Sequence, residues 1–159
     1  MPLYDNVLAG LELNGIKAAR DSRDDLVEEC LTRAGLWREA EDRLRRPGGA
    51  LSGGQQQRPC IARLLTVRTR VLSMDESCSA LDPASTRRIE ETTAGLGAEV
   101  TIVIVTHTMQ QAARVPGHCA FFLAEQGTPG IVVEHGPTGG TFGSPRDPRT
   151  ADYVNGRFG

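Results

Sequence analysis

The sequence lacks the features that mark membrane-spanning and secreted proteins. Its longest apolar run, VTIVIV at residues 100–105, is far shorter than the roughly 20 residues that a membrane helix needs. The four cysteines are scattered without a CxxC pair, so neither a zinc site nor a disulfide-stapled fold is indicated. No basic segment followed by an apolar stretch opens the chain, so we expect no signal peptide. These absences together predict a soluble protein with reduced thiols.

The chain also has no large excess of charge of one sign, and it has few aromatic residues. The formal net charge is −2, so no broad basic surface is expected and nucleic acid is not predicted as a partner. Aromatic residues make up 4% and hydrophobic residues 39% of the 159 residues, which is lean but enough for a globular core. The chain therefore has the length and composition of one ordinary domain.

The spacing of apolar residues changes near residue 70. Before that point it predicts four helices, over residues 3–14, from Asp21 or Ser22 to Gly35, over residues 37–44, and from Ser52 to about Val67. After it, strands are predicted at 71–75, 100–105, 119–123 and 130–135, helices follow Asp82 and His107, residues 136–148 are turn-rich, and a helix covers 149–155. We predict an α/β protein with a helical subdomain at 1–70 and an α/β catalytic subdomain at 71–159.

The stretch LSGGQQQR, residues 51–58, has the composition of a phosphate-binding helix start. With Ser52 as the N-cap, the backbone N–H groups of Gly53, Gly54 and Gln55 would point outward, and the helix dipole would favour an anion there. A bare Gly-Gly sequence is also typical of a flexible loop before a capped helix. On its own, the Gly-Gly pair favours this simpler interpretation.

The stretch VLSMDES places two carboxylates, Asp75 and Glu76, at the end of a predicted strand. Acids at the carboxyl end of a strand lie where α/β sheets bind ligands. Neighbouring strand residues face opposite ways, so one acid could hold Mg²⁺ while the other orients or deprotonates water. A plain acidic turn remains an alternative. The β-branched run at 100–105 predicts a parallel sheet that is covered on both faces.

Two further residues are candidates. Asp82 in SALDP is predicted to cap a helix whose first residue is Pro83. His107 follows the second buried strand, where an imidazole could donate to a phosphate oxygen. A lone histidine is more often structural, so the position alone does not decide the role of His107.

The order of these motifs resembles the nucleotide-binding domain of ATP-binding-cassette (ABC) ATPases. LSGGQQQR is similar to their signature motif, VLSMDE to the Walker B strand, SALD to the D-loop, and the dipeptide at 106–107 to the H-loop. The stretch YDNVLAGLELNG and the ending SPRDPRTADYVNGRFG resemble, within that family, the ATP-binding subunits of bacterial phosphate importers. The resemblance covers essentially the whole chain and implies a P-loop NTPase-like fold.

The resemblance also implies roles for individual residues. It implies that Ser52, Gly53, Gly54 and Gln55 contact the γ-phosphate of ATP, that Asp75 helps to hold Mg²⁺, that Glu76 is the general base, that His107 senses the γ-phosphate, and that Asp82 bridges a dimer. The expected cofactors are ATP and Mg²⁺. The expected partners are a second ABC ATPase domain, arranged head to tail, and membrane permease subunits. The expected location is the cytoplasmic face of the bacterial plasma membrane.

The family's phosphate-binding loop, GxxxxGK[ST], does not occur in the chain. The single lysine, Lys17, lies between Ile16 and Ala18, and Ile16 stands where that loop would need its lysine. The family's Q-loop glutamine is not found either. We therefore expect a fold that is incomplete as an ABC nucleotide-binding domain, corresponding to the C-terminal part of a longer protein, and little ATP binding by the isolated chain.

Two smaller departures concern folding. Pro59 falls inside the predicted signature helix, where a proline costs roughly 3 kcal/mol unless the helix kinks. Ser73 interrupts the apolar strand at 71–75, and its hydroxyl is expected to need a buried partner. Three hypotheses stay open from sequence alone: a truncated ATPase subunit, a non-catalytic partner that lends its signature helix to another subunit, and a decayed product without a stable fold.

Overall fold

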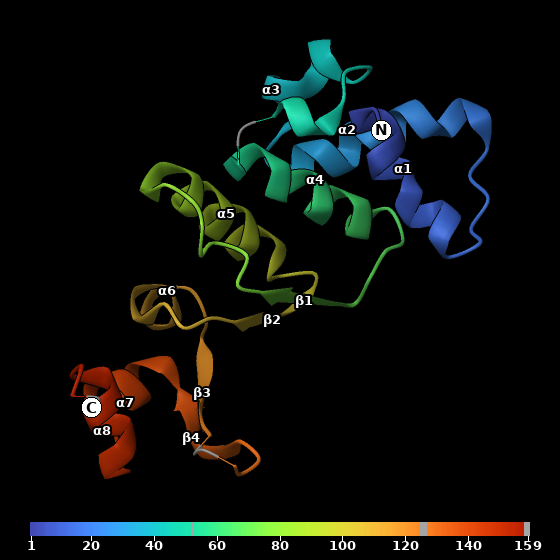
Figure 1. Ribbon diagram of the computed structural model, residues 1–159. Helices are drawn as coiled ribbons and strands as arrows, with labels where there is room; N and C mark the ends of the chain where they lie inside the picture. The colour runs from blue at the N-terminus through green and yellow to red at the C-terminus, as the bar shows by residue number, and fades with distance from the viewer. Residues whose placement is uncertain (52, 125–126, 158–159) are drawn as a thin grey trace. The chain divides into compact units, whose positions relative to one another are not determined.

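The protein is described by a computed structural model that covers residues 1–51, 53–124 and 127–157 (Figure 1). The chain forms two compact units, residues 1–105 and residues 106–159. Each unit has its own secondary structure and is described by itself.

Helices make up the first part of the first unit, as the apolar spacing predicts. They are α1 (Leu3–Leu13), η1 (Arg20–Ser22), α2 (Arg23–Arg33), α3 (Trp37–Ala40), η2 (Glu41–Arg43), η3 (Gly48–Ala50) and α4 (Gly53–Leu65). Gly35 ends the second predicted helix with a positive φ of 66°, a conformation that glycine adopts without strain. Ser22 precedes α2, but its hydroxyl donates to the Ala19 carbonyl instead of capping the helix.

The core of this unit lies where α1 and α2 pack on α4. The fully buried side chains include Leu3, Val7, Val27, Leu31 and Leu36. Gly10 marks the closest approach of α1 to α4. A Cβ atom there would overlap the carbonyl oxygen of Arg63 and would lie 2.6 Å from Oγ1 of Thr66. A side chain at residue 10 would therefore separate the two helices.

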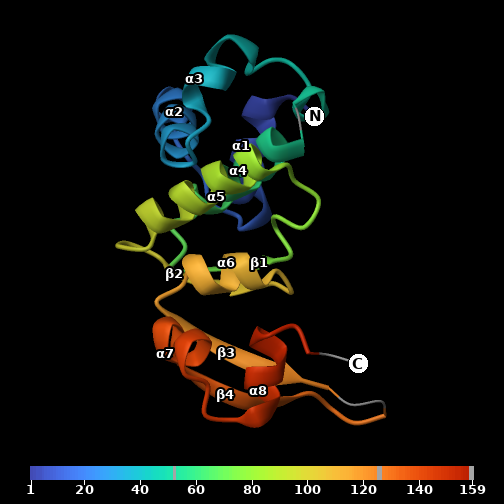
Figure 2. The same cartoon turned by 90° about the vertical axis from the view of Figure 1, so that its left-hand side faces the viewer.

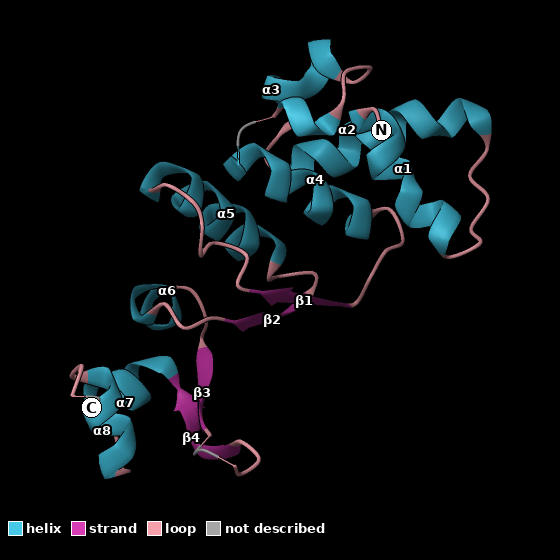
Figure 3. Cartoon of the chain, viewed as in Figure 1, coloured by secondary structure: helices cyan, strands magenta, loops and turns pink. Residues whose placement is uncertain are grey.

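A parallel βαβ arrangement follows, consisting of β1 (Val71–Asp75), α5 (Pro83–Leu96) and β2 (Thr101–Val105) (Figure 3). The strands pair in register from Val71 with Thr101 to Asp75 with Val105. Helix α5 packs against α4, as two views show (Figure 1 and Figure 2). The predicted strands and their parallel pairing are confirmed.

The apolar strands favour a sheet that is covered on both faces, and the described residues cover one of its two faces. In β1 the side chains alternate, with Leu72 and Met74 buried and the other three exposed. On the exposed face lie Val71, Val103 and Val105, with exposed fractions of 57%, 48% and 53%. Ser73 belongs to this face, so its hydroxyl meets solvent and needs no buried partner. Period-two alternation, not continuous burial, describes the strand.

Helix α4 runs through Pro59 without a break in its helical assignment. Because proline has no N–H group, residue 59 cannot donate the main-chain hydrogen bond that a helix residue normally makes to the carbonyl four residues before it. Side chains brace this end of the helix: Nε2 of Gln56 donates to the carbonyl oxygen of Leu51 at 2.8 Å. Pro59 is thus compatible with the helix, although it removes one main-chain hydrogen bond near the helix start.

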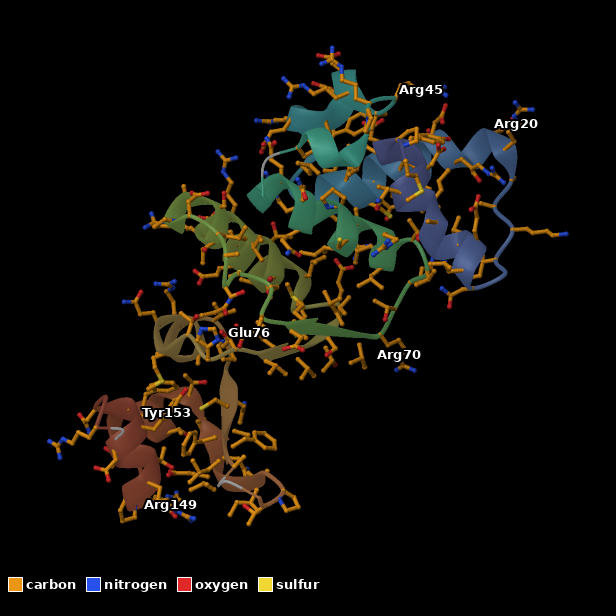
Figure 4. The ribbon with its side chains drawn as sticks, in the orientation of Figure 1. Arg20, Arg45, Arg70, Glu76, Arg149 and Tyr153 are labelled. Atoms are coloured by element: carbon orange, nitrogen blue, oxygen red, sulfur yellow. The ribbon has the colours of Figure 1, made fainter. Side chains whose placement is uncertain are left out.

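The second unit pairs an antiparallel hairpin with short helices. Its elements are α6 (Met109–Arg114), β3 (His118–Leu123), β4 (Ile131–Pro137), α7 (Thr138–Gly143) and α8 (Pro148–Val154). The ring of Tyr153 on α8 packs on Phe121 of β3, with 4.6 Å between the ring centroids (Figure 4). Helix α7 forms within the stretch at 136–148 that is predicted to be turn-rich. No helix in the described part of the chain is long and apolar enough to cross a membrane.

Candidate functional site

Two adjacent acids stand at the carboxyl end of β1, as predicted. Asp75 is the last residue of the strand and is exposed. Glu76 follows it, and its backbone N–H donates to the carbonyl oxygen of Val105 at 2.9 Å, which extends the pairing with β2 by one residue (Figure 4). Both carboxylates therefore begin where the parallel pair ends, the usual place for ligands in α/β sheets.

Glu76 has an unusual backbone conformation. Its φ is +47°, in the left-handed region that residues other than glycine rarely occupy. The chain turns sharply there, and both the N–H and the hydroxyl of Ser79 donate to the Glu76 carbonyl oxygen. Such strained residues are concentrated at functional sites, where the surrounding structure holds them in place.

Asp82 caps α5, as the sequence predicts. Its Oδ1 accepts from the N–H groups of Ala84 and Ser85, both at 3.0 Å, and its Oδ2 accepts from the Ser85 hydroxyl. The hydrogen bonds from the hydroxyl and the N–H of Ser85 lower the pKa of this exposed carboxyl. The carboxylate therefore stays ionised at the helix N-terminus, where the helix dipole favours negative charge.

The predicted phosphate-binding residues lie at the start of α4. Gly53 and Gly54 are the first two residues of the helix, while Ser52 lies outside the described residues. Gln55 is partly buried, and its Nε2 donates to Oε2 of Glu39 on α3 at 2.5 Å. The first turn of α4 is thus attached to α3 through the side chain of a signature residue.

Glu39 also binds two arginines. Nη1 and Nη2 of Arg58 lie 3.0 and 3.1 Å from its two carboxylate oxygens, and Nη1 of Arg88, on α5, lies 3.0 Å from Oε1. Burial of Glu39 by itself raises its pKa, but hydrogen bonds from Arg58 and Gln55 and the two guanidinium charges outweigh it, so the pKa is lowered. The carboxylate is the centre of a charged network that joins α3, α4 and α5.

His107 belongs to the second unit and is exposed just before α6. Beside it, the backbone N–H of Thr108 donates to Oγ1 of Thr106 at 3.0 Å, which shapes the turn into the helix. The described residues contain no group of three or more His, Cys, Asp or Glu side chains able to hold a metal ion. Mg²⁺ in nucleotide sites usually takes only one or two carboxylates, besides phosphates and water, so the oxygen donors of Asp75 suit it.

Comparison with known proteins shows similarity to ABC transporters. A family model described as "ABC transporter" matches residues 3–79. The phosphate import ATP-binding protein of Streptomyces coelicolor is 55% identical over 160 aligned positions, and that of Mycolicibacterium smegmatis is 53% identical over the same length. Both alignments cover all of this chain. The chain is therefore similar over its whole length to proteins of the ABC transporter family.

The ABC fold is also evident from a solved structure. A metal-chelate-type ABC transporter in an inward-facing conformation superimposes with a TM-score of 0.72 and 20% sequence identity, over 98% of this chain and 58% of the other. The resemblance in sequence motifs and the predicted ABC nucleotide-binding domain fold are therefore confirmed. The chain spans 62% of the length of the two phosphate import relatives.

The network around Glu39 was not predicted from the ABC motifs. Arg58 stands inside LSGGQQQR, but Glu39 lies in WREAED, a stretch without a recognisable pattern. The pairs join residues that are 16 to 49 positions apart in the chain. The feature that could have indicated the network is Arg58 itself. This arginine is buried and stands one helical turn after Gln55, on a helix that packs against other helices on two sides.

Proposed function

We propose that the chain forms part of an ATP-hydrolysing subunit of a phosphate-import ABC transporter. The observation that carries the proposal is the alignment of the whole chain, at 55% identity, with a protein named for phosphate import and ATP binding. Asp75 and Glu76 at the carboxyl end of β1 and the glycines at the start of α4 support it, since strand ends and helix starts are the usual places for nucleotide ligands.

The residues have distinct roles in the proposed reaction. Bound Mg²⁺-ATP supplies the γ-phosphoryl group, and the metal neutralises part of its charge. Asp75 provides a carboxylate ligand to the metal, and Glu76 orients the attacking water and accepts its proton. His107 donates a hydrogen bond to a γ-phosphate oxygen.

The signature residues belong to a composite site. Ser52, Gly53, Gly54 and Gln55 present N–H groups, a hydroxyl and an amide to the γ-phosphate of ATP held by a second ABC domain, and Asp82 contacts that domain. The 159 residues contain no GxxxxGK[ST] sequence, and the proposed composite site takes its phosphate cradle from the second ABC domain. Permease subunits at the inner face of the bacterial membrane complete the proposed assembly.

A chimera tests the catalytic half. The aligned segment of the Streptomyces coelicolor relative is replaced by these 159 residues, and ATP turnover is measured for the chimera and its Glu76→Gln variant. Loss of a general base is expected to lower kcat by about a hundredfold or more. The control Glu28→Gln, at an exposed position on α2, leaves kcat unchanged. An active chimera whose turnover survives Glu76→Gln contradicts the role of Glu76, and an inactive chimera contradicts the proposed activity.

A non-catalytic role is the second candidate, and the start of α4 favours it, because it can serve ATP held by another chain. The chain would then bind the Streptomyces coelicolor relative in the presence of Mg²⁺ and a non-hydrolysable ATP analogue. Gly54→Asp is expected to weaken that association, since it adds a negative charge where the phosphate is proposed to lie. Association that does not depend on nucleotide would count against both roles of the helix start.

A further inference from the structure

The side chain of Glu39 holds the start of α4 from outside the helix. It accepts a hydrogen bond from the Gln55 amide and a two-point ion pair from Arg58, which lies one turn further along the same helix. Nη1 of Arg58 also donates to the carbonyl oxygen of Gly35, just before α3. One carboxylate thus contacts two side chains near the start of α4.

This support matters because the main chain is weakened at the same place. Pro59 has no N–H group to donate to the turn before it, and the first turn of any helix has N–H groups without carbonyl partners inside the helix. Two glycines begin the turn and add backbone freedom. The orientation of the turn therefore depends on side-chain contacts to a larger degree than in an ordinary helix.

Arg58 makes the contact rigid. Its side chain is only 3% exposed, so the guanidinium is held among protein atoms and cannot exchange its partner for water. On its other side Glu39 meets Arg88 of α5, which ties the carboxylate to a third element. Each carboxylate oxygen has more than one donor, which leaves the side chain little freedom to change rotamer.

We propose that Glu39 is a positioning residue, whose carboxylate fixes the Gln55 amide and the first turn of α4 in the orientation that the nucleotide site requires. This inference rests on the proposed function of the signature residues. Glu39 itself does not touch nucleotide; it acts through Gln55. The role differs from simple stabilisation because it predicts a local effect at one helix end and a coupling to one partner residue.

Hydrogen exchange on the full 159-residue chain tests the local effect. The probe is the backbone amide of Gln57 together with that of residue 58, which bond to the carbonyls of the first α4 turn. Glu39→Ala is expected to speed their exchange by about tenfold and to change exchange in α1 by less than about twofold. Glu39→Gln, which keeps an oxygen able to accept from Gln55, should restore part of the protection. The control is Glu41→Ala, at an exposed acid two residues along.

A second background removes the effect of an unpaired buried charge. Glu39→Ala leaves the guanidinium of Arg58 without its carboxylate, which could unfold the chain by itself. In the Arg58→Met background that charge is absent, so Glu39→Ala then removes only the contacts of Glu39 with Gln55 and with Arg88 of α5. Faster exchange at Gln57 in this background supports the inference. Unchanged exchange there, or equal acceleration in α1, overturns it.

Nucleotide-dependent association gives the functional readout. The dissociation constant for the Streptomyces coelicolor relative is measured with and without Mg²⁺ and the non-hydrolysable analogue, for Glu39→Ala, Gln55→Ala and the double variant. Each single change is expected to weaken the nucleotide-dependent part by about tenfold, and the double change by little more than either one, because both act through one contact. Additive losses overturn the positioning role.

The two readouts separate the inference from the proposed function. If the unaltered chain shows no nucleotide-dependent association while Glu39→Ala still loosens the α4 start, the proposed function fails and the positioning of the turn stands. If association depends on nucleotide but neither exchange nor affinity responds to Glu39, the proposed function stands and the inference fails.

Discussion

Arg58 and Glu39 form a buried two-point ion pair, with Nη1 of Arg58 3.0 Å from Oε1 and Nη2 3.1 Å from Oε2 of Glu39. The arginine is almost fully buried and the glutamate is 30% exposed, so the pair reaches from the core to the surface. Planar, parallel contacts of this kind are stronger and more directional than a single lysine–carboxylate contact. The pair is therefore a suitable support for a helix end that has few main-chain bonds.

The stability contributed by Glu39 should disappear in acid. Burial raises the pKa of Glu39, but its arginine and amide partners bring it below the ordinary value of 4.5. A carboxyl with a lowered folded pKa stabilises the fold above its unfolded pKa, and this contribution is lost as pH falls through the folded pKa. Glu39→Gln is expected to lower the free energy of unfolding by about 2 kcal/mol at pH 7, and the difference should vanish below the folded pKa.

Urea unfolding of both proteins between pH 7 and pH 3 measures that difference. Other acids with lowered pKa, such as Asp82 and Asp147, affect both proteins equally and cancel. The control is Glu12→Gln, at an exposed position on α1, for which a constant and small difference is expected. A Glu39→Gln difference that stays the same across the whole pH range would show that the ion pair contributes nothing.

Backbone strain at Glu76 predicts an inversion of the usual effect of glycine. Glycine normally destabilises relative to alanine, but φ at residue 76 is +47°, where alanine is strained and glycine is not. Glu76→Gly is therefore expected to be more stable than Glu76→Ala by about 1 kcal/mol. Thermal or urea unfolding of the two variants measures the difference. Arg68, with φ of +50°, lies outside the proposed site, and its glycine variant should likewise be more stable than its alanine variant. Equal stabilities of the two variants at residue 76 would mean that the left-handed turn is absent in solution.

Local features of the site could be predicted from the sequence because neighbouring residues make them. Asp82 accepts only from residues two and three positions on, so SALDP contains the complete cap. The acids after β1 follow from the end of an apolar run in the same way. Glu39 illustrates the opposite case. Its partners lie on α4 and α5, and the residues that flank Glu39 in the sequence do not predict these contacts.

The covering of a sheet also depends on distant residues. The run at 100–105 is apolar on both sides of the strand, which is typical of burial on both faces. In the described chain, however, one face of β1 and β2 packs on the helical core and the other carries exposed valines. The sequence of a strand records how apolar its faces are, but the elements that cover those faces are set by the rest of the fold.

Buried thiols should react in a defined order. Cys30 is 1% exposed, and burial raises the pKa of its thiol to about 11. Because the thiolate is the reactive form, labelling of Cys30 at pH 8 should be at least about a hundredfold slower than that of an ordinary thiol. Cys60 and Cys119 are partly exposed and should react first. Mass spectrometry of the labelled peptides measures the order. Rapid labelling of Cys30 without denaturant would contradict the packing of α2 on the core.

The contact between α1 and α4 predicts opposite effects for two glycines in helices. Gly10→Ala should destabilise the fold by about 2 kcal/mol, because the new methyl group would overlap the Arg63 carbonyl oxygen and the overpacking outweighs the gain in helix propensity. In α5, a Cβ at Gly95 would meet no atom within 4 Å. Gly95→Ala should therefore stabilise by up to about 1 kcal/mol, from helix propensity alone. The free energies of urea unfolding test both predictions, and the chemical change is identical at the two positions. A higher free energy of unfolding for Gly10→Ala would show that α1 and α4 do not approach as closely as Gly10 indicates.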